Sequence, residues 1–329
     1  LCLTGYTCGD LFYSGVLLSA AKRALKEIAE STAESAMLIF VGLPIRKDGL
    51  IYNCAAALNR GRVLAFVPKT FLPDYGEYCE RRYFAPCPEK NDSVDFFGER
   101  VPFGRKFVFR AAGQESSTVA AEICEDLGAL QPPSAEHAAA GANIIVNLSC
   151  SSETAGKAEN RRRLIAEHSA RLAAGYVYAD AGEGESTTDL VFSGNDFVAE
   201  NGRILAENPP FGKNPAVAEI DTEFLAYERS RRFNYGFLPE GYEDVSFFAD
   251  DSVLLLTRAY PKTPFVPSEK EKLAPRAERI LQMQAAGLKK RVEHTNAKSV
   301  VIGLSGGVDS TLALLVAVRA MKEGGRSPA

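Results

Sequence analysis

The pattern of apolar and polar positions along the chain predicts strands that alternate with helices. Continuous apolar runs predict buried strands at residues 37–41, 118–124 and 143–148. Apolar residues at helical spacing predict helices over 14–30 and 157–174. On the second of these helices, His168 shares the apolar face, so we interpret it as a packed residue rather than a catalytic one.

Two short polar turns predict hairpins. Asn59-Arg60-Gly61-Arg62 separates an apolar run at 50–58 from another at 63–67, and Asn201-Gly202 separates 190–198 from 203–206. Asn and Gly tolerate the positive φ angles that tight hairpins require. The hairpins favour mixed rather than purely parallel sheets, so we expect an α/β fold with packed layers.

The pattern changes after residue 258. Residues 259–267 contain three prolines and predict an extended linker, which is followed by a long helix to about residue 293. Residues 299–304 then predict a buried strand that leads into a further helix. We therefore predict one domain over 1–258, a linker and long helix over 259–298, and the start of a second domain over 299–329.

Composition narrows the class of protein. The chain has 329 residues, 46% of them hydrophobic and 24% charged, which is ordinary for a globular protein. Its net charge of −4 gives no general attraction to nucleic acid, and no apolar run reaches the roughly 18 residues of a membrane span. The 7 cysteines show no Cys-x-x-Cys pair, so zinc is not expected and a reducing, cytoplasmic location is favoured. We expect small-molecule substrates, with neither nucleic acid nor a membrane as partner.

The clearest local signal is the string Ser305-Gly306-Gly307-Val308-Asp309-Ser310 between the predicted strand and the last helix. Two glycines permit a tight turn, and the N–H groups at the start of a helix attract anions. Ser305 and Ser310 add hydroxyl donors for phosphate oxygens, whereas Asp309 would cap the helix, fix a turn or hold Mg²⁺. The string lacks the lysine of the common nucleotide loop. It resembles the pyrophosphatase loop of ATP pyrophosphatases, which implies ATP binding by all six residues.

Cys124 and Lys69 are candidates for a second kind of chemistry. Cys124 ends a predicted strand and Lys69 ends a hairpin strand. Alone, such a cysteine is more often a small core residue and such a lysine a solvated strand end. Together they could supply a nucleophilic thiol and a cation that stabilises a thiolate or an oxyanion.

The segments around Lys69-x-x-Leu72-Pro73 and Cys124-Glu125-Asp126 resemble the nitrilase family, whose members use a Glu-Lys-Cys triad. With the linker and the Ser305–Ser310 loop, nearly the whole chain resembles the family of glutamine-dependent NAD synthetases. The resemblance implies a four-layer α-β-β-α sandwich followed by the start of a Rossmann-like ATP pyrophosphatase domain. It also implies ATP and Mg²⁺ as cofactors, glutamine and deamido-NAD as substrates, and a homo-oligomer.

The same resemblance implies roles for individual residues. Cys124 is the expected nucleophile, Lys69 the oxyanion partner and Glu77 the positioning glutamate. The implied glutamine-binding residues are Tyr6, Glu125, Ser151 and Lys157. Lys157 stands where the family often has arginine, and Gly128 stands where it often has a large aromatic residue. Asp309 is the implied metal ligand.

The implied reaction has two steps. Cys124 attacks the glutamine amide and releases ammonia, which then displaces AMP from adenylated deamido-NAD. The resemblance places the general-base glutamate just ahead of Leu1, and the adenylation site extends beyond Ala329, so we expect this chain to be impaired in both steps. Two alternatives stay open: a stand-alone nitrilase-type amidase, which would not explain the Ser305–Ser310 loop, and a non-catalytic scaffold.

Overall fold

The computed structural model describes residues 1–185, 189–232, 239–250, 257–260, 262–267 and 269–326. The chain divides into two compact units, Leu1–Thr257 and Arg258–Ala329. Among the described residues, no helix has both the length and the apolar character that crossing a bilayer requires.

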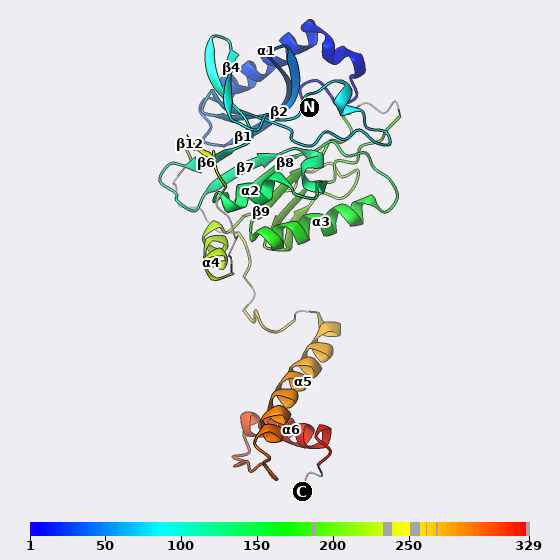
Figure 1. Ribbon diagram of the computed structural model, residues 1–329, viewed down its shortest axis with the longest axis vertical. Helices are drawn as coiled ribbons and strands as arrows, with labels where there is room; N and C mark the ends of the chain where they lie inside the picture. Colours follow the sequence, from blue (N-terminus) through cyan, green and yellow to red (C-terminus); the bar gives the residue numbers. More distant parts are fainter. Residues whose placement is uncertain (186–188, 233–238, 251–256, 261, 268, 327–329) are drawn as a thin grey trace. The chain divides into compact units, whose positions relative to one another are not determined.

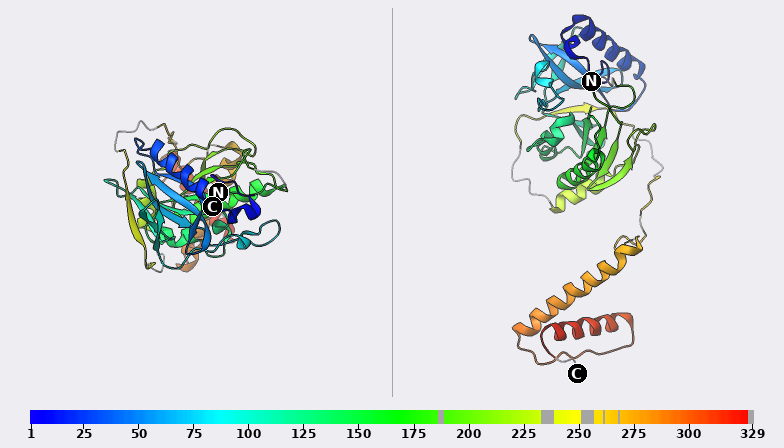
Figure 2. Two further views of the ribbon diagram at one scale, coloured as in Figure 1. Left: turned by 90° about the horizontal axis from the view of Figure 1, so that it is seen from above. Right: turned by 90° about the vertical axis from the view of Figure 1, so that its right-hand side faces the viewer.

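The first unit is built on two sheets (Figures 1 and 2). The first sheet has the order β1-β2-β3-β5-β4. Its strands are β1 (Ile39–Lys47), β2 (Leu50–Asn59), β3 (Arg62–Pro68), β4 (Asp92–Phe96) and β5 (Glu99–Phe103). The second sheet has the order β11-β10-β9-β8-β7-β6-β12. Its strands are β6 (Phe107–Ala111), β7 (Thr118–Glu122), β8 (Ile144–Leu148), β9 (Gly175–Ala179), β10 (Phe197–Glu200), β11 (Arg203–Glu207) and β12 (Glu243–Phe247).

Helices cover the outer faces of both sheets and give four layers. Helix α1 (Gly15–Ser31) packs Leu25 and Ala29 against the first sheet. On the second sheet, α2 (Pro133–Ala139) and α3 (Lys157–Leu172) contribute to a cluster that includes Ile165. A separate cluster fills the space between the sheets, with alanines from β2 and β3 facing aromatic residues from β6. The α-β-β-α sandwich that the resemblance implies is therefore present, and the described residues of this unit also form helix α4 (Thr222–Arg232).

Both predicted hairpin turns are confirmed, although the first strand of the second hairpin, β10, begins at Phe197 rather than at Leu190. β2 pairs antiparallel with β3, and the turn between them places Arg60 and Gly61 at φ angles of 46° and 77°. β10 pairs antiparallel with β11 across Asn201 and Gly202, at 45° and 90°. The second sheet is mixed, because β7, β8 and β9 are parallel neighbours while β6 and β10 flank them in antiparallel pairing.

In the second unit, the long helix α5 (Lys270–His294) and the final helix α6 (Val308–Glu323) both form. Arg319 of α6 binds Glu278 of α5 at 2.8 Å. The predicted strand at 299–304 is wrong, because this segment is irregular and Val301 is 93% exposed. A central parallel strand needs neighbours on both sides, and the described part of this unit contains no strand that could pair with it.

His168 and His137 are both buried between the second sheet and its covering helices. For His168, the helical periodicity of the sequence predicted this burial. His168 is 3% exposed, and its Nε2 lies 2.7 Å from Ser134 Oγ. Burial, and then the charge of Arg171, lowers the pKa of His168 to about 4. Burial, and then the charge of Arg105, lowers the pKa of His137 to about 3.

We expect these histidines to make the fold acid-sensitive. A histidine in the unfolded chain has a pKa of about 6.5. Below this pH the unfolded chain therefore binds protons at these positions, whereas the two histidines of the folded chain stay neutral. The contribution of each histidine to the free energy of unfolding is fully present above about pH 6.5 and should fall as the pH drops toward about 4. Between pH 6.5 and 5 we expect a loss of about 2 kcal/mol for each histidine. Urea titrations at pH 7.5 and 5 should show that His168→Gln reduces this loss. The control variant is His294→Gln, because His294 is exposed. An equal loss of stability on acidification in the wild type and in His168→Gln would contradict the expectation.

Candidate active site

Lys69 is fixed in the interior directly after β3. Its backbone N–H donates to the carbonyl of Asn53 at 2.8 Å, and its own carbonyl accepts from the N–H of Cys87 at 2.9 Å. The side chain is only 1% exposed. A buried lysine needs a partner for its charge, because an unpaired ammonium is costly away from water.

That partner is Glu80. The Nζ atom of Lys69 lies 2.6 Å from Oε1 of Glu80, whose side chain is 3% exposed. The hydroxyl of Tyr6 donates to the same oxygen at 2.9 Å. Burial acts to lower the pKa of Lys69, but the negative charges at Cys124 and Glu80 outweigh it and the pKa is raised. The site therefore holds a charged ammonium within electrostatic range of the Cys124 side chain.

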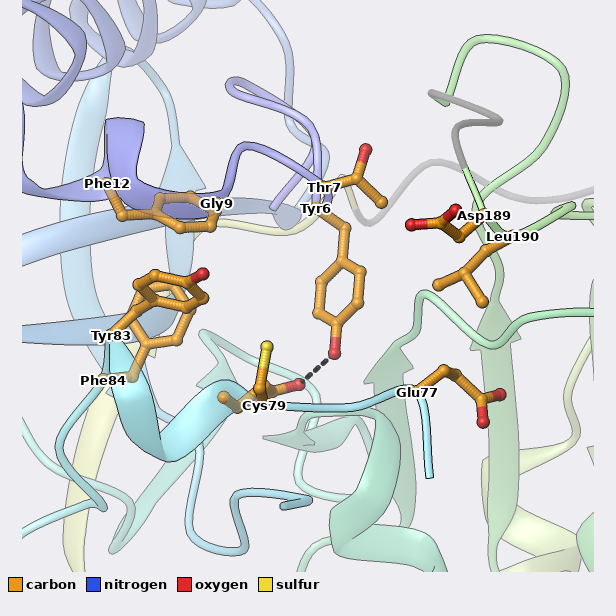
Figure 3. A pocket seen from close by; sticks show the side chains of 11 residues that line it. Tyr6, Thr7, Gly9, Phe12, Glu77, Cys79, Tyr83, Phe84, Asp189 and Leu190 are labelled. Atoms are coloured by element: carbon orange, nitrogen blue, oxygen red, sulfur yellow. Dashed lines mark hydrogen bonds between the residues drawn. The ribbon is translucent and has the colours of Figure 1, made fainter. Parts of the chain in front are cut away.

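Glu77, the positioning glutamate implied by the resemblance, does not contact Lys69. It is exposed, and its carboxylate accepts from Ser152 Oγ at 2.8 Å. In Figure 3 it lies across the cavity from Tyr83 and Phe84. Both glutamates follow Lys69 in the sequence, but residues 69–79 are irregular and their spacing does not reveal which one turns inward. The short 3₁₀ helix η2 (Glu80–Arg82) follows this loop and buries Glu80.

Cys124 stands at the turn that follows β7. It begins the 3₁₀ helix η3 (Cys124–Gly128), is half-buried and has a φ angle of 50°. This left-handed conformation is uncommon outside glycine and is often found at functional sites. The sequence predicted a strand-end cysteine but gave no sign of this backbone conformation.

Asp126 ties the cysteine turn to the lysine loop. Its Oδ1 accepts from the N–H groups of Phe71 at 2.7 Å and Thr70 at 3.1 Å, and its Oδ2 accepts from Ile123 at 3.0 Å. Burial, and then the charge of Glu122, raises the pKa of Asp126 to about 7. One buried carboxyl group thus fixes how the segments carrying Lys69 and Cys124 approach each other.

A cavity of about 330 Å³ lies on the Glu80 side of the site and a second one of about 220 Å³ lies beside Cys124. The smaller cavity brings together the nucleophile candidate and three of the four implied glutamine-binding residues. Its lining includes Cys124, Glu125, Gly128, Ser151, Lys157 and Arg161. The fourth residue, Tyr6, lines the larger cavity together with Glu77 and Glu80 (Figure 3).

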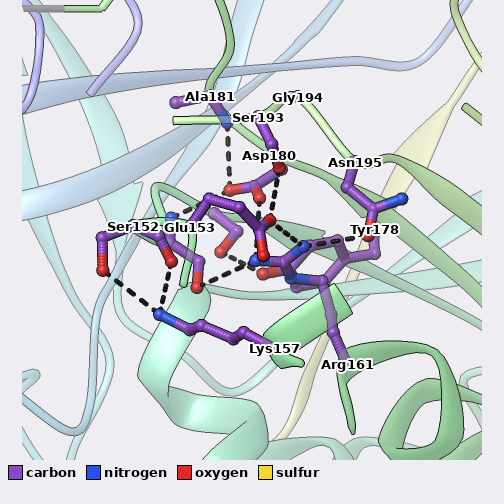
Figure 4. A network of polar contacts seen from close by, with 12 residues as sticks. Ser152, Glu153, Lys157, Arg161, Tyr178, Asp180, Ala181, Ser193, Gly194 and Asn195 are labelled. Atoms are coloured by element: carbon purple, nitrogen blue, oxygen red, sulfur yellow. Dashed lines mark hydrogen bonds and ion pairs between the residues drawn. The ribbon is translucent and has the colours of Figure 1, made fainter. Parts of the chain in front are cut away.

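Polar contacts orient two cations near the smaller cavity (Figure 4). Nζ of Lys157 donates to the Ser152 carbonyl at 2.6 Å. Arg161 is 6% exposed and binds Glu153 at 3.0 Å, while its other terminal nitrogen lies 3.5 Å from Ser151 Oγ. The structure therefore buries this arginine against the smaller cavity.

Tyr75 is a further residue that the sequence analysis missed. Its hydroxyl donates to Glu125 Oε1 at 2.8 Å and so orients the carboxylate at the cavity wall. No local pattern marks this tyrosine, because the contact joins the loop after Lys69 to the turn after Cys124.

In the second unit, the Ser305–Ser310 loop has the form of an anion site. Gly306 has a φ angle of 82°, and α6 begins at Val308. The hydroxyls of Ser305 and Ser310 lie 3.2 Å apart, and the N–H of Gly307 points to Ser305 Oγ at 3.4 Å. Asp309 lies in the first turn of α6. Within the described residues, no cluster of three or more His, Cys, Asp or Glu side chains is arranged to hold a metal ion.

Comparison with known proteins finds two family relationships along the chain. The model for carbon-nitrogen hydrolases matches residues 1–227, and the model for NAD synthases matches residues 280–326. These two regions contain the Lys69–Cys124 site and the Ser305–Ser310 loop, respectively.

Among similar proteins, the glutamine-dependent NAD(+) synthetase of Mycobacterium bovis is 40% identical over 337 residues, covering 99% of this chain and 50% of that protein. The human glutamine-dependent NAD(+) synthetase is 26% identical over 241 residues, covering 70% of this chain and 33% of that protein. The chain therefore spans about half the length, or less, of these relatives.

Solved structures support the fold. A glutamine-dependent NAD(+) synthetase from Cytophaga hutchinsonii matches with a TM-score of 0.58 and 24% identity, covering 98% of this chain and 45% of that one. A carbon-nitrogen hydrolase from Helicobacter pylori matches with a TM-score of 0.52 and 18% identity, covering 69% of this chain and 76% of that one. Since the carbon-nitrogen hydrolase model spans well over half of the sequence and includes both Lys69 and Cys124, this chain belongs to the carbon-nitrogen hydrolase family.

Proposed function

We propose that this chain carries the glutamine-hydrolysing site, and the opening of the ATP-binding site, of a glutamine-dependent NAD(+) synthetase. The observation that carries the hydrolytic half is the buried Lys69–Glu80 pair next to Cys124. Ammonia released from glutamine would displace AMP from adenylated deamido-NAD, giving NAD, AMP, pyrophosphate and glutamate.

The geometry supports distinct roles for these three residues. The thiol of Cys124 would attack the side-chain carbonyl carbon of glutamine, which forms a tetrahedral intermediate and then, as ammonia leaves, a thioester. The ammonium of Lys69 would stabilise the negative charge on the carbonyl oxygen. Glu80, held by Lys69 and Tyr6, would keep that ammonium oriented. Water then hydrolyses the thioester and releases glutamate.

The smaller cavity supports recognition of an amino acid. Glu125 would bind the α-ammonium group of glutamine, with Tyr75 holding its carboxylate in place. Lys157 would attract the α-carboxylate, and Ser151 would add a hydrogen bond from the same wall. Lys157 offers a single point of charge, whereas an arginine could bind a carboxylate through two parallel hydrogen bonds.

The Ser305–Ser310 loop supports phosphate binding. Ser305, Ser310 and the free N–H groups at the start of α6 would bind phosphate oxygens of ATP. Mg²⁺, for which Asp309 is our proposed protein ligand, would neutralise charge on the phosphates. The match of 280–326 to NAD synthases favours this function over a stand-alone amidase. The implied homo-oligomer and the cytoplasmic location remain predictions.

The nitrogen source provides the test of this proposal. In the protein that contains this chain, deamido-NAD, ATP and Mg²⁺ should yield NAD with either glutamine or ammonium chloride. Alkylating Cys124 beforehand should remove the reaction with glutamine and spare the reaction with ammonium. Hydrolysis of other amides without any NAD formation would instead favour the stand-alone amidase, and an absence of both activities would favour the scaffold.

A further inference from the structure

The side-chain amide of Asn147 contacts both the backbone N–H and the backbone carbonyl of Cys124. Asn147 lies in β8, beside the end of β7. Its Oδ1 accepts from the N–H of Cys124 at 2.8 Å, and its Nδ2 lies 3.4 Å from the carbonyl oxygen of Cys124. One side-chain amide therefore contacts the nucleophile candidate on either side of its Cα atom.

This clamp acts on a strained residue. Cys124 has a φ angle of 50°, which costs free energy for any residue with a Cβ atom. Such a conformation persists only where the surroundings over-determine it. Without the clamp, the turn could relax to a more common conformation, and the sulfur would then point elsewhere.

The orientation of Asn147 is itself fixed by a chain of buried groups. Its Nδ2 donates to the hydroxyl of Tyr176 at 3.0 Å, and that hydroxyl donates to Oε1 of Glu122. Oε2 of Glu122 accepts from the backbone N–H of Ser134 at 2.9 Å. Asn147 and Glu122 are each 1% exposed, and Tyr176 is fully buried.

The chain of contacts also determines which end of the Asn147 amide faces Cys124. A side-chain amide can rotate by 180° and exchange its donor and acceptor, which would turn its NH₂ group toward the N–H of Cys124. The tyrosine hydroxyl opposes this rotation because it donates to Glu122 and so has its lone pairs free to accept from Asn147. The carboxyl group of Glu122, anchored by Ser134 at the start of α2, thereby determines which atom of Asn147 faces the cysteine.

We propose that Asn147, oriented by Tyr176 and Glu122, is a positioning residue that fixes the left-handed backbone of Cys124 and aims its thiol toward Lys69. Asn147 contacts the backbone of the cysteine, whereas Tyr176 and Glu122 act through Asn147. The lining of the smaller cavity contains none of these three residues. The role of this clamp in catalysis rests on the proposed glutamine hydrolysis. Its effect on the reactivity of the Cys124 thiol is independent of that proposal.

The test compares two tyrosines that each lose one hydroxyl. Tyr176→Phe breaks the chain to Asn147 while keeping the buried ring. Tyr242→Phe removes a hydroxyl that lies 2.7 Å from Nδ1 of the buried His137, outside this chain of contacts. Each variant is treated with iodoacetamide, and the rate of Cys124 alkylation is followed by peptide mass spectrometry. Urea titration of both variants separates altered reactivity from lost stability.

We expect Tyr176→Phe to slow Cys124 alkylation by about tenfold, as is usual for groups that orient a reactive residue, and Tyr242→Phe to change it by less than about twofold. In the protein that contains this chain, Tyr176→Phe should lower kcat for glutamine hydrolysis by about tenfold with little change in KM. If Tyr176→Phe does not fold, Glu122→Gln, which keeps the volume, replaces it with the same expected slowing.

Equal alkylation rates in the folded Tyr176→Phe variant and the wild type would overturn the proposal. So would an equal slowing in both tyrosine variants, since that would reflect general loosening of the fold. Alkylation needs no glutamine. If the protein that contains this chain fails to hydrolyse glutamine but shows the tenfold difference in alkylation, the proposed function is refuted and the clamp is left intact.

Discussion

In the protein that contains this chain, replacing Cys124 with serine is expected to reduce glutamine hydrolysis by about 10⁴-fold or more. The serine hydroxyl is a far weaker nucleophile than a cysteine thiol, and the Lys69 ammonium can favour formation of a thiolate far more readily than formation of a serine alkoxide. Glutamate release, measured by a coupled assay, gives the rate. Acid quenching followed by mass spectrometry should detect the thioester on Cys124 in the wild type and none in the variant.

Cys87→Ser is the matched control for this substitution. Cys87 is also half-buried, and its Sγ contacts the carbonyl of Pro88 at 3.4 Å, a contact that a serine hydroxyl can preserve. We expect this variant to hydrolyse glutamine at close to the wild-type rate. Substantial activity in Cys124→Ser would show that the nucleophile has been assigned to the wrong residue.

The second large effect concerns stability as well as activity. Lys69→Met should lower the free energy of unfolding by about 3–5 kcal/mol, because it leaves the buried carboxylate of Glu80 without its counter-ion. The same substitution should abolish measurable glutamine hydrolysis, since no cation then faces the developing oxyanion. Urea titration and glutamate release measure the two effects separately.

A double variant distinguishes the two consequences. Lys69→Met with Glu80→Gln removes both charges and leaves an amide oxygen for the Tyr6 hydroxyl, so much of the lost stability should return while activity stays absent. As a surface control, Arg82→Ala breaks an exposed ion pair with Asp10 and should change stability by less than about 1 kcal/mol. Recovery of activity in the double variant would exclude a catalytic role for Lys69.

Features that depend on neighbouring residues could be predicted from the sequence. The hairpin turns at Arg60-Gly61 and Asn201-Gly202 follow from local backbone preferences, and the buried face of α3 follows from its periodicity. Cys124 and Lys69 each lie at the end of a predicted strand, and their expected roles come from the resemblance of the segments around them to the nitrilase family.

Features that depend on contacts between distant segments could not be predicted. Glu80 rather than Glu77 reaches Lys69 because an irregular loop and a short helical turn decide which carboxylate points inward. Tyr75 meets Glu125 across 50 positions of sequence, and Tyr176 meets Glu122 across 54. The strand expected at 299–304 failed for the same reason, since a strand exists only if another strand pairs with it.

The parallel arrangement of β7, β8 and β9 has a consequence for how the site can evolve. Cys124, Ser151 and Asp180 all lie in the segments that leave the same edge of the sheet, just beyond the strand ends. Loops at such an edge can change in length and composition without altering the packed layers beneath them. Divergence toward new amide substrates can therefore proceed by replacing the segments after β8 and β9, while the turn after β7 retains the proposed nucleophile.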